Sequence, residues 1–225
     1  MADYDSLEYH LKYFSENDIT DEKLYDYLAK TDRAKLRRLM SRLERVEAVN
    51  FPGGQGKKKF EGKKSRVKGM VYERVIRVLF ESVKGFQSFK NISTQTNELD
   101  ILIVFGPSAA LTTPIKHWGT HCICECKNHG GRVKGDWLQK LRSVLHTHNA
   151  KVGLLFSKGG LAERSQLRTT IQIFAGQHPP RIILCFSWED LVACAEGENF
   201  LSLLNRRYVE LTANLRDLLL SDPDS

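Results

Sequence analysis

The stretch that decides the fold runs from residue 97 to residue 127 and holds two apolar segments, NELDILIVF at 97–105 and HCICECK at 121–127. Both have the length and composition of β-strands, and the first ends at a Gly-Pro pair that favours a turn. We therefore expect two neighbouring strands of one sheet. Charged side chains interrupt both segments, although charged residues usually lie outside strands as apolar as these.

The pattern around this pair of strands predicts a mixed α/β domain over residues 69–186. Strands separated by helices favour parallel pairing, and consecutive strands favour an antiparallel meander. The expected fold is therefore a mixed central sheet flanked by helices. Its expected elements are helices over 69–83, 134–148 and 162–175, and strands over 86–94, 97–105, 121–127, 151–157 and 181–186.

The N-terminal part of the chain predicts a helical extension and then a linker. Residues 1–50 contain short helical patterns, of which the clearest covers 31–49. Residues 51–68 contain a proline, several glycines and many lysines with almost no apolar residues, which predicts a flexible linker or loop.

The C-terminal residues 187–225 predict further helices. Ser187, followed three residues later by Asp190, has the spacing of a helix-capping pair. Residues 201–220 form a leucine-rich amphipathic pattern, which either packs on the domain or forms a dimer interface.

The composition bounds the class of protein. The chain has 225 residues, of which 41% are hydrophobic and 27% charged, values typical of a globular protein with one sizeable core. The longest apolar runs have the length of strands and are far shorter than the ~20 residues of a transmembrane helix. The first residues, MADYDSLEYH, are acidic and polar where a secretory signal would be basic and apolar. We therefore expect a cytoplasmic protein.

Five cysteines, an odd number, favour buried reduced thiols over a disulfide framework. Three of them form the C-x-C-x-C pattern of residues 122–126, and this spacing places all three on one face of a strand. Structural zinc sites usually have C-x2-C spacing instead. A small apolar face is therefore the favoured interpretation, and a metal site is the alternative.

The positive charge is concentrated ahead of the expected domain. The net charge is +7, and the segment over residues 57–68 has seven basic residues against one acidic residue. Such a segment would bind phosphates through counterion release and without base specificity, unless it is only a solvated linker. The arginine-rich face of the helix over 31–49 has the same two interpretations. The expected nucleic-acid-binding residues are Lys57, Lys58, Lys59, Lys63, Lys64, Arg66 and Lys68.

The charged residues of the two strands form a candidate site. Alternation places Glu125 and Lys127 on the face opposite Cys126. If the strands pair with Asp100 near Glu125, two carboxylates and an ammonium converge. Adjacent carboxylates repel each other, and an oxygen-ligand cation such as Mg²⁺ or Mn²⁺ relieves that repulsion. The backbone carbonyl of Cys126 lies between the two side chains and is a further expected ligand.

Such a site suits the hydrolysis of phosphodiesters. A bound metal polarises the phosphoryl oxygen and lowers the pKa of a water molecule that attacks in line. Lys127 would orient that water or stabilise the charge that develops on the phosphate. The alternative interpretation is that Asp100, Glu125 and Lys127 are surface charges on an exposed face of the sheet.

The segments N-E-L-D-I-L-I-V and I-C-E-C-K-N resemble the PD-(D/E)xK nuclease superfamily, with its Asp and E-x-K at Asp100, Glu125 and Lys127. The continuation G-G-R-V-K-G-D-W-L-Q-K-L, an apolar strand and S-K-G-G-L-A-E-R-S resemble the Mrr-like restriction endonuclease branch over residues 69–186. The resemblance implies a restriction-endonuclease-like core. The usual proline before the Asp is absent here, where Glu98 and Leu99 stand.

The same resemblance implies two helper residues. Glu73, in G-M-V-Y-E-R-V, matches a glutamate that assists metal binding and catalysis in that branch. Its alternative role is an ion pair with Arg77, one helical turn away. Gln139, on the helix after the E-x-K strand, matches a polar catalytic helper.

The resemblance therefore implies a Mg²⁺-dependent DNA endonuclease of a bacterial restriction or phage-defence system. DNA, other defence proteins and a second copy bound through the C-terminal helices are the expected partners, and no membrane is expected. One alternative is a nucleic-acid-binding module that has the nuclease fold but does not cleave or needs a partner to do so. Another is an RNA or junction-specific nuclease. No phosphate-binding G-x4-G-K-[ST] loop and no H-E-x-x-H motif occur, and no segment indicates base readout.

Overall fold

The computed structural model describes residues 32–212 except 54, 84, 95–97, 107, 108, 110–114, 129, 161–170, 172, 173 and 175–177. The expected helix over 162–175 therefore lies almost wholly outside the described residues. The elements are α3 (Arg33–Ala48), α4 (Lys57–Glu81), β1 (Phe86–Ser93), β2 (Glu98–Phe105), the 3-10 helix η2 (Ile115–His117), β3 (His121–Lys127), α5 (Gly135–Thr147), β4 (Val152–Ser157), β5 (Ile182–Phe186), α7 (Trp188–Glu196) and α8 (Phe200–Thr212).

The five strands form one sheet in the order β1-β2-β3-β4-β5. The first three strands pair antiparallel, and β4 and β5 pair parallel to β3. This topology confirms the predicted mixed sheet. The pairing of β2 with β3 ends at Ile101 opposite Cys124. Asp100 and Glu125 are the next residues beyond that last pair, so the charged residues lie where the two strands stop pairing.

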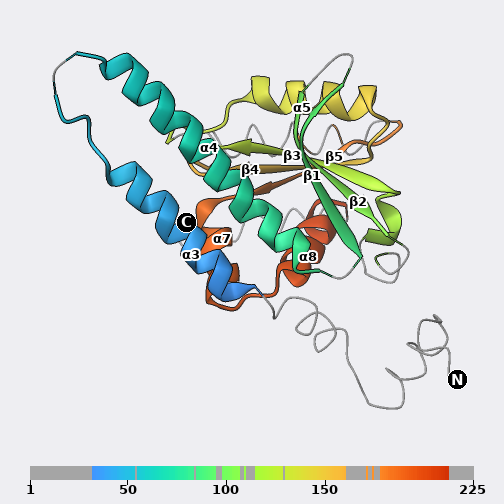
Figure 1. Cartoon of the computed structure of the whole chain (residues 1–225). Helices are drawn as coiled ribbons and strands as arrows, with labels where there is room; N and C mark the ends of the chain where they lie inside the picture. The colour runs from blue at the N-terminus through green and yellow to red at the C-terminus, as the bar shows by residue number, and fades with distance from the viewer. Residues whose placement is uncertain are drawn as a thin grey trace, which may run out of the picture.

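Helices cover both faces of the sheet (Figure 1), with α5 on one side and α7 and α8 on the other. The face covered by α3, α4, α7 and α8 includes Phe156 of β4, and the face covered by α5 includes its neighbour Leu155. Every residue of β4 is buried, because a central strand in parallel pairing is covered on both faces. This burial explains the uninterrupted apolar run of that segment.

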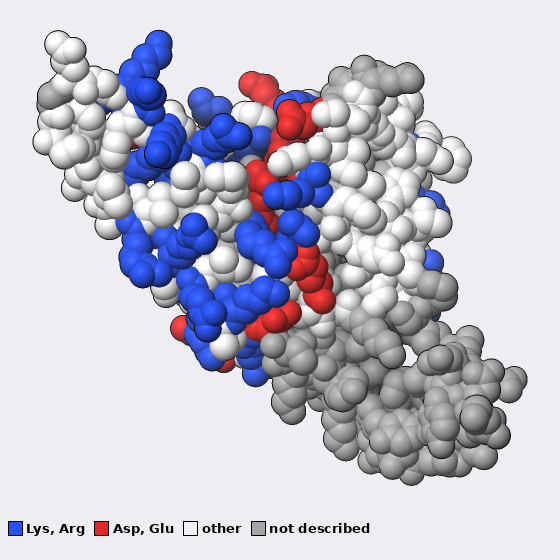
Figure 2. Space-filling view, viewed as in Figure 1, with Lys and Arg blue, Asp and Glu red and all other residues white. Residues whose placement is uncertain are grey.

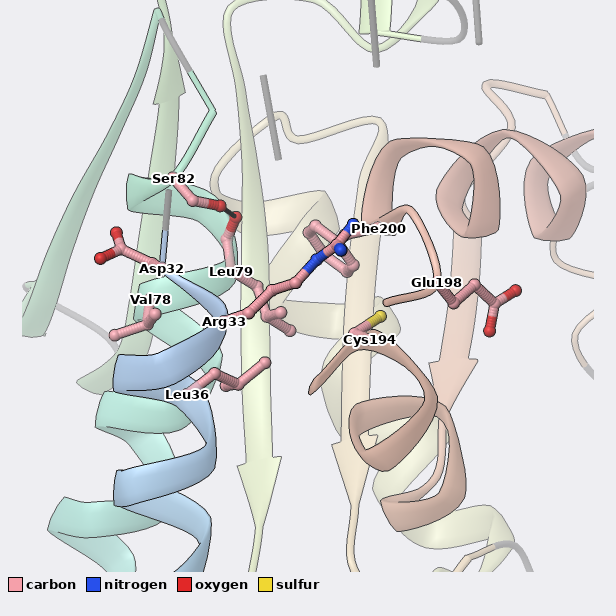
Figure 3. A pocket seen from close by; sticks show the side chains of 9 residues that line it. All are labelled: Asp32, Arg33, Leu36, Val78, Leu79, Ser82, Cys194, Glu198 and Phe200. Atoms are coloured by element: carbon pink, nitrogen blue, oxygen red, sulfur yellow. Dashed lines mark hydrogen bonds between the residues drawn. The ribbon is translucent and has the colours of Figure 1, made fainter. Parts of the chain in front are cut away.

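Helix α3 is part of the core, as the helical pattern over 31–49 predicts. Leu36, Met40 and Leu43 are buried in the same cluster as the sheet. The guanidinium of Arg33 donates to the carbonyl of Gly197 at 3.0 Å, just beyond the end of α7. Figure 3 shows Arg33 extending from α3 toward α7 and α8 across a small cavity. The volume of this cavity is about 20 Å³. At least one α3 arginine therefore stabilises the fold.

The expected linker over 51–68 is wrong for its lysine-rich half, because α4 begins at Lys57. Lysine is a good helix former, and its long side chain can reach partners that a composition argument does not see. Lys64 Nζ donates to the carbonyls of Glu47 at 2.9 Å and Val49 at 2.6 Å, at the C-terminal end of α3. The glycine-rich half is the real turn, where Gly56 has a φ of 98°.

The C-terminal helices pack within the chain in the part described. Ser187 and Asp190 form the predicted capping box at the start of α7. Phe200, Leu201 and Leu204 of α8 are buried in the core with the sheet, so this part of the predicted 201–220 pattern packs on the domain. Among the described residues, no helix is both long enough and apolar enough to span a membrane.

Candidate functional site

Asp100 lies at the open end of the β2–β3 pair. Its Oδ2 accepts a hydrogen bond of 2.8 Å from the backbone N–H of Cys126. A side-chain oxygen thus replaces the backbone acceptor that an extended ladder would supply. The bond fixes the Asp100 carboxylate beside the E-x-K segment, as the sequence predicts.

Glu125 and Lys127 lie together on the face of β3 that α5 covers. Lys127 Nζ is bonded to Glu125 Oε1, and both side chains are largely buried, with 12% and 16% of their surface exposed. The Lys127 ammonium also lies 3.7 Å from the ring centroid of Trp137 on α5. The cation–π contact and the ion pair together hold the ammonium in one place. These residues are therefore not freely exposed surface charges.

Glu73 extends from α4 toward the same end of the sheet. Burial raises the pKa of Glu73, and the nearby Asp100 and Glu98 carboxylates raise it further, although Lys90 and Arg77 oppose this effect. The electrostatic effect of Asp100 on Glu73 indicates that α4 brings a third carboxylate close to the β2–β3 opening.

The expected alternative for Glu73, an ion pair with Arg77, is not formed. Arg77 Nη2 instead bonds Glu81 Oε1 at 2.6 Å, and its Nε donates to Ser88 Oγ at 2.9 Å. Glu73 therefore lies near the Asp100 and Glu98 carboxylates and the Lys90 ammonium of the sheet.

The C-x-C-x-C cysteines form a buried apolar face. Cys122 and Cys124 are fully buried in the core, and Cys126 packs against it. Burial raises the pKa of the Cys126 thiol well above its ordinary value, and the charges of Asp100 and Glu73 raise it further. Burial likewise raises the pKa of the Cys124 thiol, and a raised pKa disfavours the thiolate that zinc requires.

The carboxylates do not form a ready metal site. Among the described residues, no three His, Cys, Asp or Glu side chains form a group that could hold a metal ion. Asp100 is turned to the Cys126 amide, and Glu125 to Lys127. In kind, the donors still fit a hard divalent cation, because carboxylate and carbonyl oxygens are the ligands that Mg²⁺ prefers. The Asp100 and Glu98 carboxylates, which together with burial raise the pKa of Glu73, also favour a cation there.

The structure adds two residues that the sequence did not single out. Trp137 is the α5 residue over Lys127. Asn128 follows Lys127 directly, and its Nδ2 and Oδ1 are both buried without a hydrogen-bond partner in the described part of the chain. Buried amides almost always have partners, so an unsatisfied one beside a candidate site marks a place for a ligand or water. The only sequence signal was its position after the E-x-K motif.

Gln139 does not reach this site. It is exposed on α5 and lines a different cavity with Arg142 and Arg181. Trp137 and Gln139 are two residues apart, which turns their side chains about 200° from each other around the helix. Because Trp137 faces Lys127, the expected role of Gln139 as a catalytic helper is not supported by its position.

The expected nucleic-acid-binding residues divide into two groups. Two of them have partners within the chain: Lys64 bonds the end of α3, and Lys68 Nζ lies 3.5 Å from Glu47 Oε1. The exposed residues are Lys57, Lys58, Lys59, Lys63 and Arg66.

Three of the exposed residues, Lys59, Lys63 and Arg66, are here called the α4 stripe. At ~100° per residue they lie within about 80° of Glu73 around the helix axis, so they share its side of α4. Figure 2 shows Lys and Arg side chains gathered over α3 and α4, with a line of acidic side chains along one edge of this basic surface.

Comparisons with protein-family models, with curated proteins and with solved structures give no match. The assignment of a function therefore depends on the residues of the site and on the sequence resemblance.

Proposed function

We propose that this protein is a divalent-metal-dependent nuclease that hydrolyses DNA phosphodiester bonds through a PD-(D/E)xK site of the Mrr-like type. The observation that carries the proposal is the place where β2 and β3 stop pairing: Asp100 bonds the Cys126 amide there, between the paired residues Glu125 and Lys127, and Glu73 lies in electrostatic range of Asp100. The element order around it, helix, three antiparallel strands, helix and parallel strand, is the order that the resemblance implies.

Each residue has a role that its position supports. Asp100, Glu125, Glu73 and the Cys126 carbonyl would hold Mg²⁺ or Mn²⁺, which activates water and polarises the phosphate. Lys127 stabilises the charge that develops on the phosphate oxygens, since Trp137 holds its ammonium in place before substrate binds. The largely buried setting strengthens this effect, because water screens the ammonium less.

The α4 stripe supports DNA as the substrate. Lys59 lies 14 residues before Glu73, which at ~1.5 Å per residue separates them by about 21 Å along α4. That length corresponds to roughly six base pairs at 3.4 Å each, so the stripe can follow a backbone into the site. Contacts of this kind give affinity without sequence preference. A restriction or phage-defence role is part of the proposal on the strength of the resemblance.

One observation favours a second candidate, a nucleic-acid-binding module that does not cleave. Asp100 and Glu125 each already have a partner within the chain, and no metal-ready group occurs among the described residues. A chain that kept the fold only for binding would tolerate such pairs.

The deciding experiment incubates the purified protein with plasmid, linear duplex, single-stranded DNA and RNA in Mg²⁺, Mn²⁺ or EDTA. We expect metal-dependent cutting of DNA, reduced by about 100-fold or more in Asp100→Asn and in Lys127→Met. Asp136→Asn and Lys134→Met are the matched controls, because both residues are exposed and lie outside the site. Undiminished cutting in both site variants would show that the site is wrong. DNA binding without cutting in any metal would favour the binding module.

A further inference from the structure

A second polar cavity lies on the outer side of α5, away from the E-x-K residues. Its volume is about 450 Å³, which is large enough for a small anion with its hydration. None of its described lining residues is acidic, and several are cationic or can become so. The lining residues are Gln139, Arg142, Ser143, His146, His178, Pro179 and Arg181.

Arg181 gives this cavity its chemical character. Arg181 is only 6% exposed and is the one buried cationic residue among those described. Its Nη1 donates to the neighbouring Pro180 carbonyl at 3.3 Å, and its Nε is buried without a hydrogen-bond partner in the described part of the chain. A guanidinium cannot lose its proton to escape burial. A buried charge that has no acidic partner among the described residues is costly, and an anion in the cavity would offset it.

The surrounding side chains are arranged to bind such an anion. His146 lies three residues after Ser143 and four after Arg142 on α5, so it neighbours both side chains on the helix surface. The guanidinium of Arg142 lies 4.9 Å from the ring centroid of Phe174, and this cation–π contact helps to hold it in place. His178 approaches from the segment before β5, so donors enter the cavity from two elements. Two guanidinium groups with imidazole and hydroxyl donors suit the tetrahedral oxygens of phosphate.

The cavity is separate from the candidate catalytic site. Arg181 precedes β5, and the next residue, Ile182, donates to the Lys151 carbonyl at the start of β4. Lys127 pairs with Ser157 at the other end of β4. Six residue steps from Lys151 to Ser157 at ~3.3 Å place these two points about 20 Å apart. A ligand bound here therefore cannot be the phosphate attacked at the E-x-K residues.

We propose that this cavity is a phosphate-binding site, which takes inorganic phosphate or the terminal phosphate of a monoester, with Arg181 as its main anchor. The site is independent of the proposed nuclease activity, since no residue is shared between them.

The test is isothermal titration of the full chain with inorganic phosphate. We expect saturable binding below about 10 mM, which becomes at least tenfold weaker in Arg181→Gln, a loss of about 1.4 kcal/mol. Lys151→Gln is the matched control, an exposed cation at the same end of the sheet that does not line the cavity, and it should bind phosphate as the wild type does. Asp100→Asn should also bind it unchanged, which separates this site from the nuclease proposal.

Because Arg181 is buried, its replacement can impair folding, so a second variant, His146→Ala with His178→Ala, is measured as well. Both histidines are exposed, and the double variant should fold and bind phosphate several-fold more weakly. No binding by the wild type, or equal binding by every folded variant, would overturn the proposal. A 5′-phosphorylated oligonucleotide, compared in EDTA with its 5′-hydroxyl form, distinguishes the sources. Preference for the phosphorylated end indicates nucleic acid, and equal binding of the two indicates a small free phosphate.

Discussion

The glycine contact beside Lys127 gives the sharpest structural prediction. A Cβ added at Gly159, in the turn after β4, would lie 2.5 Å from the carbonyl oxygen of Gly131 and 2.8 Å from its carbon. Both atoms are backbone and cannot rotate away. Two nearby hydrogen bonds, from Lys158 N to the Lys127 carbonyl at 3.0 Å and from Val133 N to the Gly160 carbonyl at 2.9 Å, hold the same two loops together. Gly159→Ala must therefore push these loops apart.

The size of the effect follows from the distances. Ordinary contact begins near 3.4 Å, so a clash at 2.5 Å requires a separation of about 0.9 Å. Overpacking of this kind costs about 1–3 kcal/mol, and the rigid backbone on both sides favours the upper half of that range. For a chain of this length, about 2–3 kcal/mol lowers Tm by roughly 4–12 °C. A shift of this size beside Lys127 should also reduce cleavage by up to about 100-fold.

Calorimetric unfolding and the plasmid-cleavage assay measure the two effects. Gly130→Ala is the matched control, because the same substitution there meets no atom within 4 Å and Gly130 has no positive φ. We expect the control to unfold and cleave as the wild type does. If Gly159→Ala unfolds within about 1 °C of Gly130→Ala, the close packing of the two loops is wrong.

Three further predictions concern the site, the basic helix and the pH response. Trp137→Leu removes the contact with the Lys127 ammonium, so if the proposed function holds, kcat should fall about tenfold while DNA affinity, measured by gel shift, is unchanged. Replacing all three residues of the α4 stripe by Gln should weaken DNA binding and reduce the slope of log K against log salt by about 2–3. Burial alone would raise the pKa of Glu81, but the Ser88 hydrogen bond and the charges of Arg74 and Arg77 lower it overall. Glu81→Gln should therefore lower the free energy of unfolding at neutral pH by about 0.5–1 kcal/mol. The difference between the variant and the wild type should shrink as the pH falls below about 4.5 through the lowered pKa. Urea unfolding at several pH values measures this difference.

Each of these predictions has an outcome that would contradict it. An unchanged kcat in Trp137→Leu would mean that the ring does not position the ammonium. Equal salt slopes for the α4 stripe variant and for a triple variant of the exposed Lys134, Lys140 and Lys151 would place the DNA interface elsewhere. A Glu81→Gln difference that grows toward acidic pH would reverse the assigned direction of the pKa shift.

The sheet was predictable from local pattern, because burial on one or both faces imposes a period that the sequence records. The capping pair of Ser187 and Asp190 was predictable for the same reason, since both partners lie within one turn. The helical state of residues 57–68 was not. Lys64 contacts the carbonyls at the end of α3, and such a contact between separate elements leaves no periodic signal.

The site, too, was predictable only where a local pattern fixes the position of a residue. Strand alternation correctly placed Glu125 and Lys127 on one face, and strand pairing correctly placed Asp100 beside the backbone of the E-x-K segment. Alternation says nothing about which residue of the next helix turns inward, so Trp137 was missed and Gln139 was assigned to a site that it does not reach. Arg181 was missed because its importance comes from burial, and a single arginine before a strand has no pattern that predicts burial.

The pairing of Lys127 with Glu125 bears on both candidate functions. With Glu125 as its partner, the Lys127 ammonium has its charge balanced within the chain and is a weak ligand for phosphate. Lys127 can turn its full charge to a substrate only when Glu125 gains another cationic partner, and the carboxylates of Asp100 and Glu73 already create the negative potential that attracts one. The same ion pair would thus keep the site inactive without a cation and ready with one. In a module that only binds nucleic acid, the pair would instead be permanent, so that neither metal nor DNA would alter the surroundings of Lys127.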